Sequence, residues 1–90
     1  MNNTNELENA LNLGPASAAW LREIGVVTLT DLREMGAVTA YCLVKAQRER
    51  ASLNLLYALH GAMTGQKWND LSAETKAQLQ EEVAGFRFGG

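Results

Sequence analysis

A glycine–proline pair at Leu13-Gly14-Pro15 constrains the fold of this chain more than any other feature of the sequence. Proline lacks a backbone N–H and holds φ at about −65°, so it suits the first position of a helix and breaks a helix elsewhere. Pro15 is the only proline among the 90 residues. The chain is therefore expected to turn here between two short helices.

The segments on both sides of this break have the apolar spacing of helices. Before it, a short helix is predicted to begin at Asn3 or Thr4, with one apolar face formed by Leu7, Ala10 and Leu11. After it, a second helix is predicted from Pro15 to Gly25, with an apolar stripe formed by Ala18, Leu21 and Ile24.

Two more helices are predicted in the next part of the chain. Thr28 and Asp31 have the spacing of a capping box, which predicts the start of a third helix that ends at Gly36. A fourth helix is predicted over 37–47, and its apolar residues lie on most of its sides. Such a helix is expected at the centre of the core.

The C-terminal half predicts two helices joined by a turn. Ser52 is a suitable N-cap for a fifth helix, and Gly65 is a suitable end for it. Gly61 lies inside this helix at a cost of about 1 kcal/mol relative to alanine, which indicates close approach of another helix. A turn at 68–71 leads to a last helix, capped by Ser72, whose apolar side carries Leu79, Val83 and Phe86.

Length and composition predict one domain with a packed core. Ninety residues are too few for two domains, and 47% hydrophobic against 20% charged residues opposes wholesale disorder. The expected fold is all-α, a compact bundle of five to six short helices. It is expected to cover residues 1–90, with its core at about 6–85 and a flexible tail at 86–90.

The composition also disfavours several classes of function. Cys42 is the only cysteine, so no disulfide framework or cysteine cluster for zinc is available, which fits a cytoplasmic protein. The first residues lack the pattern of a signal peptide, and no apolar stretch approaches the ~20 residues that cross a bilayer. Cys42 and His60 lie on different predicted helices, so we expect no catalytic residues, metal site or cofactor, and no enzyme.

Positive charge gathers in the middle of the chain, although the net charge is −2. Residues 41–68 carry one acidic residue and four basic ones, Lys45, Arg48, Arg50 and Lys67. Lys45 and Arg48 share a helix face, and Arg50 lies in the connection to the fifth helix. These three residues are a candidate surface for phosphate or an acidic partner, although surface charge usually serves only solubility.

The turn before the second helix resembles the phosphate-binding hairpin of helix–hairpin–helix domains, h-x-Gly-h-Gly-x-x-x-Ala. The two glycine positions, the apolar position between them and the small residue align with Asn12, Gly14, Leu13 and Ala18. In such hairpins, glycines of positive φ and a helix N-terminus present N–H groups to the anion. Asn12 tolerates positive φ and Ser17 keeps a hydroxyl, but Ala16 stands where a basic residue often lies. The hairpin is thus expected to keep its structural role of joining two helices and to have lost the ability to bind phosphate.

An ordered set of residues further resembles the C-terminal domain of the TfoX/Sxy competence regulators, over roughly residues 8–84. The set comprises Leu13-Gly14-Pro15, Ser17-Ala18-Ala19-Trp20-Leu21, Ile24-Gly25, Thr28, Asp31-Leu32, Gly36-Ala37-Val38, Tyr41, Ser52-Leu53-Asn54-Leu55-Leu56-Tyr57-Ala58-Leu59, Gly61-Ala62, Gly65 and Trp68-Asn69-Asp70-Leu71. The resemblance implies a compact helical fold, related to helix–hairpin–helix and SAM domains. It also implies a bacterial, cytoplasmic, non-enzymatic role in regulating competence genes and DNA uptake. Family members carry an N-terminal domain that this chain lacks, which leaves either an excised domain or a stand-alone protein.

Recognition of another protein is the leading functional hypothesis from the sequence, with a transcription factor or RNA polymerase as the partner. The surfaces concerned are the hairpin at Asn12, Leu13, Gly14 and Ser17, the basic residues Lys45, Arg48 and Arg50, and the interface anchors Trp20 and Trp68. The alternative is direct, mainly non-specific DNA binding through the hairpin and the basic segment. Self-association is a third hypothesis.

Overall fold

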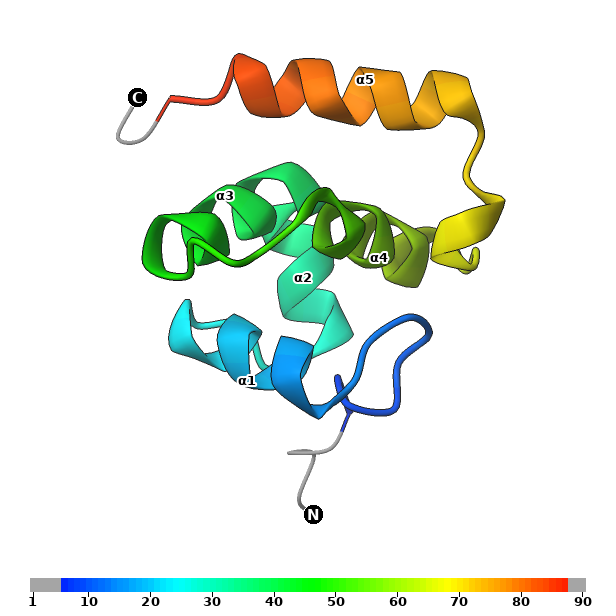
Figure 1. Ribbon diagram of the computed structural model, residues 1–90. Helices are drawn as coiled ribbons and strands as arrows, with labels where there is room; N and C mark the ends of the chain where they lie inside the picture. The colour runs from blue at the N-terminus through cyan, green and yellow to red at the C-terminus, as the bar shows by residue number, and fades with distance from the viewer. Residues whose placement is uncertain (1–5, 88–90) are drawn as a thin grey trace.

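The computed structural model describes residues 6–87, and these residues form α-helices and a 3-10 turn without any strand. The elements are α1 (Pro15–Glu23), α2 (Leu29–Met35), α3 (Ala37–Gln47), α4 (Leu53–Thr64), η1 (Trp68–Asp70) and α5 (Ala73–Ala84) (Figure 1). The all-α prediction is confirmed, and the predicted start of the second helix at Pro15 and the bounds of the fourth helix agree with α1 and α3.

The predicted helix before the proline is wrong over the described residues, because 6–12 form successive turns. The amide of Ala10 donates to the Leu7 carbonyl and that of Leu13 to the Ala10 carbonyl, each at 3.1 Å, which are spacings of three residues. Leu7 is fully buried, whereas Leu11 is 41% exposed, so the expected apolar face does not form. Distant partners hold both ends of the segment instead: Glu6 accepts from the amide of Leu29, and Asn12 bonds to Gln66 and Trp68. The predicted caps Asn3 and Thr4 lie outside the described residues.

Thr28, Ser52 and Ser72 each precede a helix as predicted, and two of the three form the capping hydrogen bond. Thr28 Oγ1 accepts a hydrogen bond from the amide of Asp31 at 3.0 Å, and Asp31 Oδ2 accepts one from the amide of Thr28 at 3.2 Å. Ser72 Oγ accepts from the amide of Thr75 at 3.1 Å and so caps α5. Ser52 precedes α4 as predicted, but its side chain makes no capping hydrogen bond.

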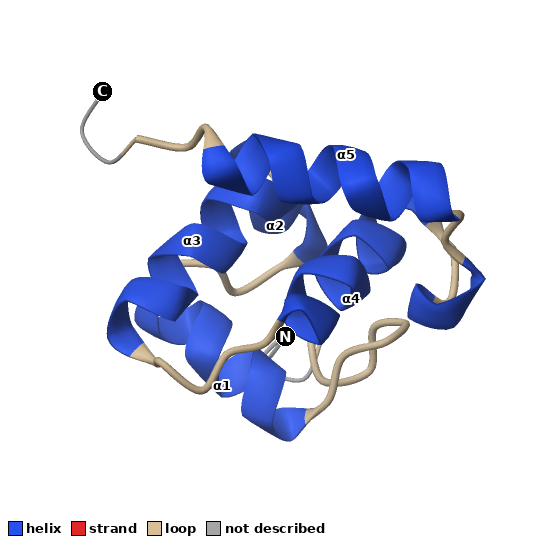
Figure 2. Cartoon of the chain, turned by 45° about the horizontal axis from the view of Figure 1, so that its top comes forward, coloured by secondary structure: helices blue, strands red, loops and turns tan. Residues whose placement is uncertain are grey.

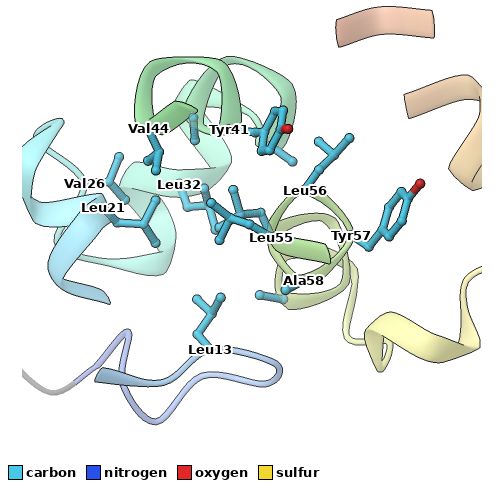
Figure 3. Packing of buried hydrophobic residues seen from close by; sticks show 14 of the residues in the cluster. Leu13, Leu21, Val26, Leu32, Tyr41, Val44, Leu55, Leu56, Tyr57 and Ala58 are labelled. Carbon is cyan, nitrogen blue, oxygen red and sulfur yellow. The ribbon is translucent and has the colours of Figure 1, made fainter. Parts of the chain in front are cut away.

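The core is centred on α3 and α4, which pack against each other in the middle of the molecule (Figures 1 and 2). α5 lies along one side of this pair, and α1 lies on the opposite side. The largest fully buried side chains come from four helices and two loops: Leu7, Leu21, Val26, Leu32, Val44, Leu56 and Leu59. Figure 3 shows Leu21 and Val26 near Leu32 and Val44, and Leu13 pointing from the turn before α1 towards Ala58. The prediction of a central fourth helix is confirmed.

Candidate interaction site

The turn before α1 departs from the phosphate-binding hairpin in residue type at the first glycine position and in backbone conformation at the second. Asn12 has φ of +72°, so the expected positive φ is found at this residue. Gly14 has φ of −139° and ψ of −171°, an extended conformation open to any residue, so a positive φ at the second glycine position is not found. The turn is retained, but its backbone does not follow the two-glycine pattern.

The side chain of Asn12 is engaged within the protein. Its Nδ2 donates to the Gln66 carbonyl at 2.8 Å and, at 3.5 Å, to the Ala58 carbonyl. Its Oδ1 accepts from the amide of Trp68 at 3.0 Å. The amide group that replaces the hairpin glycine therefore joins the N-terminal turn to α4 and η1.

Gly61 makes room for this arrangement. A Cβ atom at Gly61 would lie 2.3 Å from the Gln66 carbonyl oxygen and 2.4 Å from Asn12 Nδ2, closer than real Cβ atoms come. The close approach predicted at this glycine is present. The prediction that another helix makes it is wrong, because the neighbours are the Asn12 side chain and the backbone just after α4.

A hollow of about 300 Å³ opens beside this junction and brings together residues from every group that the sequence singled out. It includes Asn12 and Ser17 from the hairpin, Trp20 and Trp68, and Arg50. Leu13 is buried in the core instead, at 8% exposure, and Gly14 does not line the hollow. The connection from α3 to α4, which carries Arg50, passes α1 in Figure 2. Ser52, Asn54, Leu55 and Ala58 complete the lining.

The structure separates the three basic residues. Lys45 Nζ donates to the carbonyls of Glu49, at 2.5 Å, and Ala51, at 2.8 Å, and so satisfies the backbone after α3. Arg48 forms a two-point ion pair with Glu23, which raises the pKa of the guanidinium through its hydrogen bonds and negative charge. Arg50 makes no hydrogen bond or ion pair with residues 6–87. It is also the only charged residue that lines the hollow within that range.

The two tryptophans differ in their exposure. Trp20 is half-buried on α1 and packs against the core. Trp68 is 39% exposed, and its ring lies 6.0 Å from Lys76 Nζ, which also lies 5.2 Å from the Tyr57 ring. Trp68 is therefore the wall of the hollow that is more open to a partner.

Comparison with known proteins places this fold in a family. The sequence pattern of the TfoX C-terminal domain matches residues 3–83, nearly the whole chain. The chain belongs to the TfoX C-terminal domain family. The crystal structure of an uncharacterized protein from Listeria monocytogenes, in a triclinic form, is similar with a TM-score of 0.80 and 25% identity, covering 88% of this chain and 90% of that one.

A protein of unknown function from Listeria monocytogenes, in a tetragonal form, has a TM-score of 0.79 and 25% identity to this TfoX C-terminal domain. The matched region covers 88% of this chain and 98% of the Listeria chain. No curated protein matches the sequence. The family is of a regulatory type and is not a known enzyme family.

Chemistry-bearing side chains do not converge in the described part of this TfoX C-terminal domain. Cys42 is buried, and this burial raises the pKa of its thiol. His60 is half-buried and lines a hollow under α5, whereas Cys42 lines a different one beside Tyr41. Residues 6–87 contain no group of three or more His, Cys, Asp or Glu placed to hold a metal. Among these residues, no helix has the length and apolar character needed to span a bilayer.

Sequence reasoning missed part of the lining of the hollow in this TfoX C-terminal domain. Ser52 was predicted as a helix cap, and neither Ser52 nor Asn54 was predicted as a site residue. Both line the hollow because the start of α4 faces α1 and η1. An unused capping hydroxyl leaves no trace in the sequence, so nothing there could have identified Ser52.

Proposed function

We propose that this TfoX C-terminal domain is a non-enzymatic regulatory module that recognises another protein at the hollow between α1, α4 and η1. The observation that carries the proposal is the convergence on one concave surface of Trp20, Trp68 and Arg50, which pairs with no residue within 6–87. Tryptophan and arginine contribute most of the binding energy at many protein interfaces, especially where they meet in a pocket.

The family supports a finer proposal, namely regulation of competence genes and DNA transformation in the bacterial cytoplasm. The partner would be a transcription factor or RNA polymerase.

A capture experiment in the source organism tests this function. The tagged chain, cross-linked in growing cells, should retain one defined partner, and Trp68→Ala should abolish the retention. Val27→Ala is the matched control, because Val27 is 47% exposed and does not line the hollow. Transformation frequency and transcription of competence genes should fall in the Trp68→Ala strain only. Retention that is equal in both variants would contradict the proposed surface.

Direct DNA binding is the second candidate function. It is favoured by the open space at Gly14, where an added Cβ would meet nothing within 4 Å at the uncapped start of α1. It is disfavoured by Ala16 in the basic position and by the internal use of Lys45 and Arg48. Duplex and single-stranded DNA are titrated at low and moderate salt. Binding tighter than about micromolar at moderate salt, lost in Gly14→Val, would favour DNA over protein recognition.

A further inference from the structure

We infer that the hollow binds an acidic segment of the partner protein, with a carboxylate paired to Arg50 and an apolar side chain held between Trp20 and Trp68. This inference rests on the proposed function and specifies the chemistry of the partner.

The positive charge of Arg50 in the hollow favours a negatively charged group of the partner. Arg50 is the only charged residue in the lining, and no residue within 6–87 pairs with it. The neighbouring Arg48 already holds Glu23. A guanidinium presents N–H groups in a planar fork that matches both oxygens of a carboxylate. The unused fork of Arg50 is therefore complementary to an aspartate or glutamate side chain.

The polar side chains around Arg50 reinforce this preference. Ser17, Ser52 and Asn54 line the hollow, and none makes a side-chain hydrogen bond within residues 6–87. The first turns of α1 and α4, which reach this surface, contain no acidic residue. The partial positive charge of the two helix starts thus has no carboxylate of its own there. Donors are available around Arg50, and the lining contributes no competing negative charge.

The remaining lining is apolar and favours a peptide side chain. Trp20, Leu55, Ala58 and Trp68 contribute to the walls. A hollow of about 300 Å³ is at the lower end of the range for small-ligand pockets, so it accommodates a few side chains of a segment. Aromatic walls provide a large contact area with little loss of side-chain entropy.

The same features make a nucleic acid a poorer occupant. Proteins that bind DNA without sequence preference gain affinity by neutralising several phosphates, and each contact requires a cation. The hollow offers Arg50 alone, in a chain of net charge −2. The side chain of Asn12 is occupied by the protein's own backbone, so it cannot turn towards a phosphate.

Selection from a library of short random peptides displayed on phage tests the inference. The immobilised chain should enrich peptides in which aspartate or glutamate stands next to a large apolar residue. Binding of the selected peptides is followed by intrinsic fluorescence, because the chain has two tryptophans and both line the hollow. Each peptide is compared with an analogue in which its carboxylates are amides.

The amide analogue should bind about ten- to a hundredfold more weakly, as expected for loss of a charge-assisted hydrogen bond. Arg50→Gln should weaken binding of the acidic peptide by the same factor and should leave the affinity for the amide analogue unchanged. Arg33→Gln is the matched control, since it removes the same charge from an exposed residue of α2 that does not line the hollow. It should leave both affinities unchanged.

The possible failures can be told apart. Failure to enrich acidic peptides, or equal binding of peptide and analogue, overturns the inference. If non-acidic peptides are selected and Trp68→Ala abolishes their binding, the inference fails while recognition of protein at the hollow stands. A single-stranded oligonucleotide that binds through Arg50 more tightly than any peptide overturns both. Association of the chain with itself, seen by sedimentation at two concentrations and lost in Arg50→Gln, would make a second copy the occupant.

Discussion

Replacing Gly61 by alanine should separate the end of α4 from the N-terminal turn. The new Cβ would lie 2.3 Å from the Gln66 carbonyl oxygen and 2.4 Å from Asn12 Nδ2, whereas ordinary contact begins at 3.4 Å. The Asn12 side chain can rotate away, but only by giving up its hydrogen bonds to Gln66 and Trp68. The Gln66 carbonyl belongs to the backbone and moves only with the chain around it.

The expected cost follows from three contributions. Overpacking at a buried position costs about 1–3 kcal/mol. Two lost hydrogen bonds add about 1 kcal/mol each, and the better helix propensity of alanine returns about 1 kcal/mol. The net loss in free energy of unfolding is then about 2–4 kcal/mol, out of about 4–14 kcal/mol for a chain of this length. The thermal midpoint should fall by about 10–30 °C.

Thermal and urea unfolding followed by circular dichroism measure this loss. Gly85→Ala is the control, because Gly85 has φ of −90° and an added Cβ would lie 3.7 Å from its nearest neighbour, in ordinary contact. Asn12→Gly, which permits the same positive φ without the side chain, should reduce the cost of Gly61→Ala in the double variant. A Gly61→Ala protein as stable as the wild type would refute the close packing inferred at this junction.

The remaining predictions concern caps and ionisation. Ser72→Ala should lower the free energy of unfolding by about 1 kcal/mol, since the Ser72 hydroxyl caps α5. Ser52→Ala should have little effect, because the Ser52 side chain makes no capping hydrogen bond. Equal urea midpoints for the two variants would contradict the assigned caps. Stability should decline as the pH rises through the ordinary pKa values of 9.0 for cysteine and 10.0 for tyrosine. Burial raises the pKa of the Cys42 thiol. Burial also raises the pKa of Tyr41, with smaller contributions from the charges of Cys42 and Tyr57. The unfolded chain therefore loses these protons at lower pH than the folded chain, which lowers stability as the pH rises. Thermal midpoints across the alkaline range measure the slope, which Cys42→Ala should make shallower; an unchanged slope would contradict the contribution of the thiol. The buried thiol should also react with a disulfide reagent only as fast as the protein opens, so a rate insensitive to urea would contradict its burial.

Short-range features of the sequence predicted most of the helices. The Thr28–Asp31 capping box, the proline at the start of α1 and the glycine after α4 act over three or four residues, so their effect does not depend on the rest of the fold. The segment 6–12 was predicted wrongly for the corresponding reason. Its apolar spacing is helical, but its conformation is set by distant partners, as when Glu6 accepts a hydrogen bond from the amide of Leu29 at 3.2 Å.

The candidate site could be predicted only as separate pieces. The sequence determined that a turn precedes Pro15, that Asn12 tolerates positive φ, and that tryptophans and basic residues stand beside turns. Only the tertiary structure decided that Lys45 and Arg48 are used internally while Arg50 faces a hollow with both tryptophans. The physical reason is the range of the contacts, since Asn12 meets Trp68 across 56 residues of chain. Contacts of that separation depend on how the helices pack, which no local pattern specifies.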